Sequence, residues 1–252
     1  MSKFFRQPLD DVVACLEPIV AVRNPLRAIA PLFLSLVVCW FVYVPIHELL
    51  HAFGCWVTGG EVTRLEISAR YGGGILAEYV PFVVSGSEYA GRLSGFETHG
   101  SDLVYLATDF MPFMLTLVIG VPLLKLAGRR RRPILFGTAI VVGLAPFYNL
   151  PGDYFEMGSI MVTRFVTVLR GWSGPAAYEK LRSDDIFKLL ETYFTNPAEL
   201  ELAGAWNKIG GAGVILLSGA MAILLAFVTY ALGHAFSRWV VAPTPRRAVP
   251  SA

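Results

Sequence analysis

Residues 28–57 read AIAPLFLSLVVCWFVYVPIHELLHAFGCWV, and Glu48 is the only Asp, Glu, Lys or Arg in this stretch. A helix needs about 20 predominantly apolar residues to cross a bilayer, so the stretch is long enough to span one. An ionisable side chain inside a span is expensive to bury and marks a functional site by default. The stretch therefore predicts a membrane-spanning helix that carries chemistry near its end.

The composition of the whole chain agrees with this assignment. Of its 252 residues, 55% are hydrophobic and 16% are charged, and the mean hydropathy is +0.57, which is too apolar for an ordinary soluble domain. The expected fold class is an all-α polytopic membrane protein with about four transmembrane helices and the lipid bilayer as a partner. The other three predicted spans are 103–124, 133–162 and 209–233. A net charge of +2 is too small to indicate a nucleic-acid partner.

The connection 125–132 decides the expected topology. It holds five basic residues and no acid, and basic residues collect on the cytoplasmic side of membrane spans. We therefore expect this connection and both termini to be cytoplasmic, in a cytoplasmic (inner) membrane. The N-terminal segment 1–27 contains three acids and no long apolar core, so it predicts a cytoplasmic or interfacial helix and not a signal peptide.

The two long loops contain their own secondary-structure signals. Residues 62–67 alternate and are followed by three glycines at 72–74, which predicts a short membrane-associated β-hairpin. In the second loop, 163–208, Ser183 is expected to cap a helix and Asn196-Pro197 to begin another. The expected parts are an N-terminal segment (1–27), an intramembrane core (28–165), an extracytoplasmic helical loop (166–208), and a last span with a basic tail (209–252).

His47-Glu48-Leu49-Leu50-His51 is an HExxH motif. On a helix, the spacing of four residues places both imidazoles on one face, where they can bind one Zn²⁺. Glu48 can accept a proton from a metal-activated water and pass it to a leaving amine, which is the role of a general base. The three cysteines form no CxxC pair, so they predict neither a disulfide nor a thiolate zinc site.

A catalytic zinc needs a third protein ligand, and Asp153 is the leading candidate. His47 lies 20 residues after Arg27 and Asp153 lies 21 residues after Arg132, so two parallel helices would bring them to similar depth. Pro151-Gly152 breaks the helix just before the acid. Glu156, one turn later, is the alternative ligand or a group that hydrogen-bonds a ligating imidazole.

Other polar residues leave more than one interpretation open. Asn149 could hold a ligand or an oxyanion, or could serve as a turn residue. Asp109 could line a water path or could be an interfacial acid. His99 and His234 are expected to be ordinary histidines outside the metal site.

The zinc motif in the first core span, followed about a hundred residues later by the segment Asn149-Leu150-Pro151-Gly152-Asp153, resembles the site-2 protease family of intramembrane zinc metalloproteases. The resemblance implies a three-helix metalloprotease core, zinc held by His47, His51 and Asp153, and Glu48 as general base. It also implies cleavage of transmembrane or membrane-adjacent protein substrates. The glycines around Gly73 would then present substrate in an extended form.

Two other functions use the same residues. A zinc-binding membrane pseudo-protease would keep the metal without cleaving its clients, and an ion- or proton-handling membrane protein would use the buried acids and histidines for transport. Stoichiometric zinc that is lost when His47 or His51 is changed would argue against transport.

Overall fold

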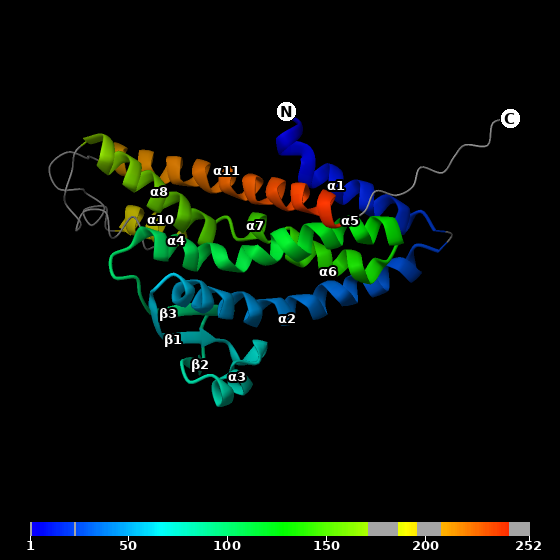
Figure 1. Ribbon diagram of the computed structural model, residues 1–252, viewed down its shortest axis with the longest axis horizontal. Coiled ribbons are helices and arrows are strands. Elements are labelled where there is room, and N and C mark those ends of the chain that lie inside the picture. Colours follow the sequence, from blue (N-terminus) through cyan, green and yellow to red (C-terminus); the bar gives the residue numbers. More distant parts are fainter. Residues whose placement is uncertain (1, 23, 171–185, 196–207, 242–252) are drawn as a thin grey trace.

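The computed structural model describes residues 2–22, 24–170, 186–195 and 208–241. Long helices lie side by side in a bundle, and a small sheet with one short helix lies against the outside of α2 (Figure 1). The helices of the bundle are α1 (Lys3–Val20), α2 (Leu26–Val57), α4 (Asp102–Phe110), α5 (Val121–Arg130), α6 (Pro133–Gly143), α7 (Ala145–Tyr148), α8 (Asp153–Arg170), α10 (Ile186–Thr195) and α11 (Lys208–Val240).

Three helical segments among the described residues are long and apolar enough to cross a membrane. They are Leu26–Val57, Asp102–Arg130 and Gly213–Val240. The second is continuous in its path although a 3₁₀ turn, η2 (Met111–Phe113), and a π-helical turn, η3 (Thr116–Gly120), separate α4 from α5. A mostly helical fold with three candidate membrane-spanning helices is therefore confirmed, but four spans are not.

The predicted span 133–162 is interrupted, which accounts for the difference. Its residues form α6, the single turn of α7, and the first part of α8. Pro146 has no N–H to offer the carbonyl of Val142, and the Thr116 hydroxyl donates to that carbonyl instead at 2.7 Å. Pro151 and Gly152 then separate α7 from α8. Proline and glycine thus interrupt the helix, although the segment is apolar enough for a single span.

Close packing of α8 on α11 fixes the position of the interrupted segment. A Cβ atom on Gly158 would lie only 3.1 Å from the backbone nitrogen of Ala222, so the two helix backbones approach closely. The Tyr154 hydroxyl also donates to Thr229 Oγ1 of α11 at 2.8 Å. Asp153, the first residue of α8, is therefore carried by a helix that is held firmly in the bundle.

The β structure differs from the predicted hairpin. The alternating stretch does form a strand, β1 (Glu61–Ile67), but it pairs in parallel with β2 (Val83–Ser85) and antiparallel with β3 (Gly91–Glu97). The glycines at 72–74 make no hairpin turn. Gly72 has a left-handed backbone with φ of +81° that ends the 3₁₀ turn η1 (Ala69–Tyr71), and α3 (Gly73–Tyr79) begins directly after it.

The segment between β1 and β2 returns along the flank of α2. The Trp40 indole nitrogen donates to the Tyr71 hydroxyl at 3.2 Å, and the Tyr71 ring contacts the ring of Phe41 at 5.3 Å between centroids. Ile75 and Tyr79 of α3 are exposed. The segment therefore lies beside the middle of α2, a helix that is long and apolar enough to cross a membrane.

The predicted N-terminal helix is present as α1, and Asp11 attaches it to the bundle. The Asp11 carboxylate accepts from Lys125 of α5 at 3.2 Å, and from Tyr230 and His234 of α11 at 3.1 Å and 2.8 Å. His234 is thus a structural partner of Asp11.

The second predicted loop is only partly described. The α8 helix continues to Arg170, beyond the expected loop start at 163, and α10 confirms a helix in the loop. Its predicted cap, Ser183, and the helix start predicted at Asn196-Pro197 lie outside the described residues.

Candidate metal centre

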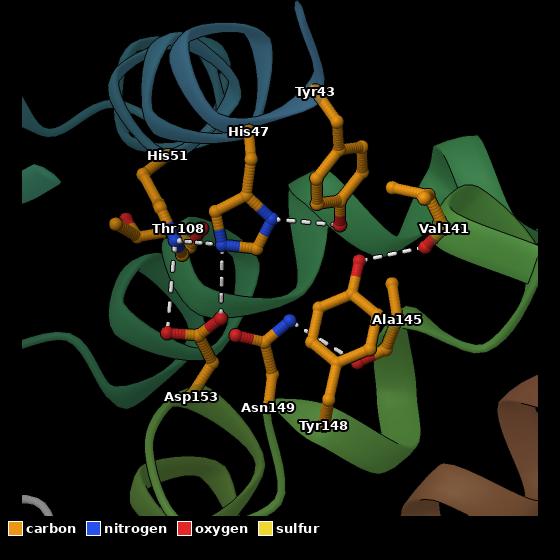
Figure 2. A network of polar contacts seen from close by, with 9 residues as sticks. All are labelled: Tyr43, His47, His51, Thr108, Val141, Ala145, Tyr148, Asn149 and Asp153. Carbon is orange, nitrogen blue, oxygen red and sulfur yellow. Dashed lines mark hydrogen bonds and ion pairs between the residues drawn. The ribbon is translucent and has the colours of Figure 1, made fainter. Parts of the chain in front are cut away.

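His47, His51 and Asp153 converge on one point inside the bundle (Figure 2). His47 Nε2 and His51 Nε2 are 3.1 Å apart. Asp153 Oδ2 lies 3.2 Å from His47 Nε2, and its Oδ1 lies 3.7 Å from His51 Nε2. Each imidazole is only 6% exposed. Two ligands one helical turn apart on α2 thus meet a carboxylate from the opposite side of the bundle.

The outer nitrogen of each imidazole has a partner that fixes its orientation (Figure 2). His51 Nδ1 lies 2.8 Å from the backbone oxygen of Thr108. A carbonyl oxygen can only accept, so Nδ1 carries the proton and Nε2 presents a lone pair to the centre. His47 Nδ1 lies 2.9 Å from the Tyr43 hydroxyl. The sequence pattern predicts neither partner, although Tyr43 stands one helical turn before His47.

The atoms that face one another fit a bound cation. Two imidazole lone pairs and a carboxylate repel when nothing lies between them, and Asp153 Oδ2 is buried without a hydrogen-bond partner in the described part of the chain. Ligands at typical zinc distances in tetrahedral geometry stand about 3.3 Å from one another. The three observed separations, 3.1, 3.2 and 3.7 Å, bracket that value. This group could therefore hold a metal ion.

The interruption of the helix before α8 directs the Asp153 side chain toward the histidines. The backbone N–H groups of Phe155 and Glu156 both donate to the Gly152 carbonyl, which closes the first turn of α8 around the acid. Asn149 donates from Nδ2 to the Ala145 carbonyl at 3.1 Å, so it serves as a turn residue that closes α7. Its side chain lies next to Asp153 (Figure 2).

Glu48 follows His47 on α2 and contacts the sheet. Its carboxyl group interacts electrostatically with both His51 and Asp153. A Cβ atom on Gly91, the first residue of β3, would lie 2.9 Å from Glu48 Oε1 and closer still to Cγ and Cδ. Only glycine therefore allows β3 to pass over this glutamate, and the sheet limits where its carboxylate can go.

The remaining candidate residues lie outside the group of three. Glu156 accepts from the Tyr105 hydroxyl at 3.2 Å, and the imidazole nitrogens are occupied by Tyr43 and Thr108. Asp109 on α4 is 5% exposed. Its carboxyl group interacts electrostatically with those of Glu156 and Asp153.

Two further residues lie away from the metal centre. Gly73 packs against the carbonyl of Ile67 at the start of α3 and does not belong to the group of three. His99 lies 4.0 Å from Glu61, as expected of a histidine with no part in the centre.

No family model, no curated protein and no solved structure matches this chain, so its functional interpretation rests on the chemistry of its own residues.

Proposed function

We propose that this chain is an intramembrane zinc metalloprotease. The observation that carries the proposal is the meeting of His47 and His51 with Asp153, with Glu48 beside them on a membrane-spanning helix. Two histidines and a carboxylate leave one position open in a tetrahedral site, which is the arrangement of a catalytic and not a structural zinc.

Zinc is the metal that this donor set favours. Imidazole nitrogen with a single carboxylate suits zinc better than magnesium or calcium, which prefer sites built from oxygen. When bound, zinc supplies a Lewis acid that polarises a carbonyl and makes water acidic enough to be deprotonated near neutral pH. His47, His51 and Asp153 hold it in place.

Glu48 handles the protons in the proposed reaction. Its carboxylate accepts a proton from the attacking water and later donates it to the amine that leaves when the peptide bond breaks. A group in this role must stay within hydrogen-bond reach of the reacting atoms. The contact with Gly91 supports the role, because β3 limits the positions that the Glu48 carboxylate can take.

The substrate is a transmembrane or membrane-adjacent protein segment in extended form. A helix hides its backbone in internal hydrogen bonds, so a protease must bind a segment that is locally unwound. Within the described residues β3 is an edge strand of the sheet, and it begins at Gly91 beside Glu48. An extended peptide pairing with that edge would lie near the catalytic residues. In this proposal β3, and not the glycines around Gly73, presents the extended substrate.

Replacing Gly91 with alanine is expected to lower the turnover number about 10- to 100-fold, because the added methyl group must displace either Glu48 or β3. Metal content should not change, since the atoms nearest to the added methyl group belong to Glu48, which is not a proposed ligand. The assay is cleavage of a model transmembrane substrate by purified protein in detergent, with metal analysis of the same sample.

The matched control for that variant is Gly95→Ala. A Cβ atom on Gly95 would lie 2.7 Å from Cβ of Arg64, so the same strand is crowded to a similar degree but away from Glu48. Equal loss of turnover in both variants would mean that strand distortion, and not the position of Glu48, is responsible.

We further propose that the interrupted segment from α6 to α8 makes a fourth crossing, and that both termini are cytoplasmic. A cysteine replacing Arg130 should then resist an impermeant thiol reagent added outside intact cells and react after the membrane is opened. A cysteine replacing the exposed Glu88, in the first long loop, should react from outside. The reverse pattern would invert the topology.

Metal analysis and a cleavage assay together test the proposed function. The expected result is one zinc per chain and hydrolysis of a transmembrane peptide that stops on chelation. Stoichiometric zinc with no cleavage of any membrane peptide would favour a pseudo-protease. A protein that retains no metal would favour ion or proton handling.

A further inference from the structure

A row of hydroxyl groups extends outward from His47, away from the metal position. Tyr43 meets His47 Nδ1 at 2.9 Å. The Tyr148 hydroxyl lies next to the Tyr43 hydroxyl (Figure 2). Tyr148 in turn donates to the carbonyl of Val141 at 2.6 Å.

The carbonyl at the end of this row limits the hydrogen bonds that the two hydroxyls can form. Val141 can only accept, so the Tyr148 proton is committed to it. The Tyr148 oxygen can then only accept from its neighbour Tyr43, and in that arrangement the Tyr43 oxygen is left to accept from His47 Nδ1–H. His47 is thereby left with a lone pair on Nε2, the nitrogen that faces Asp153.

The same two tyrosines join the segments that carry the ligands. Tyr43 stands one helical turn before His47 on α2, and Tyr148 is the last residue of α7, shortly before Asp153. Their rings meet edge to face with centroids 6.3 Å apart. Tyr43 is only 4% exposed and belongs to the same core cluster as Val141 and Tyr154.

We infer that Tyr43 and Tyr148 are positioning residues for the metal centre, and that they hold His47 in the tautomer and orientation that bind zinc. The inference rests on the proposed zinc site. Metal-binding histidines usually donate their second nitrogen to a carboxylate, a backbone carbonyl or water. His51 follows that pattern with the carbonyl of Thr108, whereas the second nitrogen of His47 meets the phenol group of Tyr43.

The test is metal affinity of the purified full chain in detergent, measured by competition with a chromophoric chelator. Tyr43→Phe keeps the ring and removes the acceptor, so we expect zinc to bind about 10- to 100-fold more weakly. Tyr148→Phe leaves the His47 contact in place and should give a smaller loss in the same direction. Both variants should also change the visible absorption of bound Co²⁺, because the imidazole is free to reorient.

Tyr230→Phe is the matched control. Tyr230 is 1% exposed and its hydroxyl donates to Asp11 at 3.1 Å, so it contacts α1 and not the group of three proposed ligands. Its loss should affect stability without changing zinc affinity or the Co²⁺ spectrum.

The outcomes separate this inference from the proposed function. Native protein that binds zinc, together with Tyr43→Phe of unchanged affinity and spectrum, would overturn the inference and leave the zinc site intact. Should Tyr43→Phe fail to accumulate, unchanged affinity in Tyr148→Phe would overturn it equally. Native protein that binds no zinc would remove the proposed site itself.

Discussion

Asp153→Ala is expected to release the metal and abolish proteolysis, whereas Glu156→Ala should keep the metal with at most partial loss of activity. Asp153 supplies both carboxylate oxygens to the centre, at 3.2 and 3.7 Å from the two imidazoles. Its removal leaves two histidines, and two ligands do not hold a zinc site that needs three. We expect affinity to fall by more than about 100-fold, the upper end of the effect of losing an outer partner.

Glu156 is the proper comparison because it is an acid on the same helix, one turn further along. It accepts from Tyr105 and does not belong to the group of three. Metal analysis of the two purified variants decides between them. Full occupancy in Asp153→Ala together with loss in Glu156→Ala would reverse the assignment of the third ligand.

Glu48→Gln is expected to retain the metal and to lower turnover by about 10²- to 10⁴-fold, the usual contribution of a general base. Glutamine has nearly the same shape as glutamate, so the contact with Gly91 and the fold should survive. It cannot accept and return a proton, so the chemical step should fail.

The control for Glu48 is Glu78→Gln, which makes the same change on the exposed surface of α3. Normal metal content in both variants, with turnover lost only in Glu48→Gln, is the expected pattern. Proteolysis retained by Glu48→Gln would remove the glutamate from the reaction and leave the metal site unaffected.

Local sequence was sufficient where the determining signal lies within one segment. The apolar run of α2 and the four-residue spacing of His47 and His51 place two imidazoles on one face of a helix, and the structure has them there. The Pro151-Gly152 pair predicts a break before Asp153, and α8 begins at that residue. Asp153 lies beside His47 and His51, as the similar distances from Arg27 and Arg132 along the chain predict, even though 133–162 is not one continuous helix.

Tertiary structure alone decided the contacts between distant segments. The Thr108 carbonyl reaches His51 only once α2 and α4 have packed together, and the ring of Tyr148 reaches that of Tyr43 only once α7 has packed against α2. The pairing of β1 with two later strands, and the passage of Gly91 over Glu48, also join residues far apart in the chain. Hydropathy and spacing describe how a helix or strand presents its own side chains, but the partner of each side chain is set by packing, which no single segment contains.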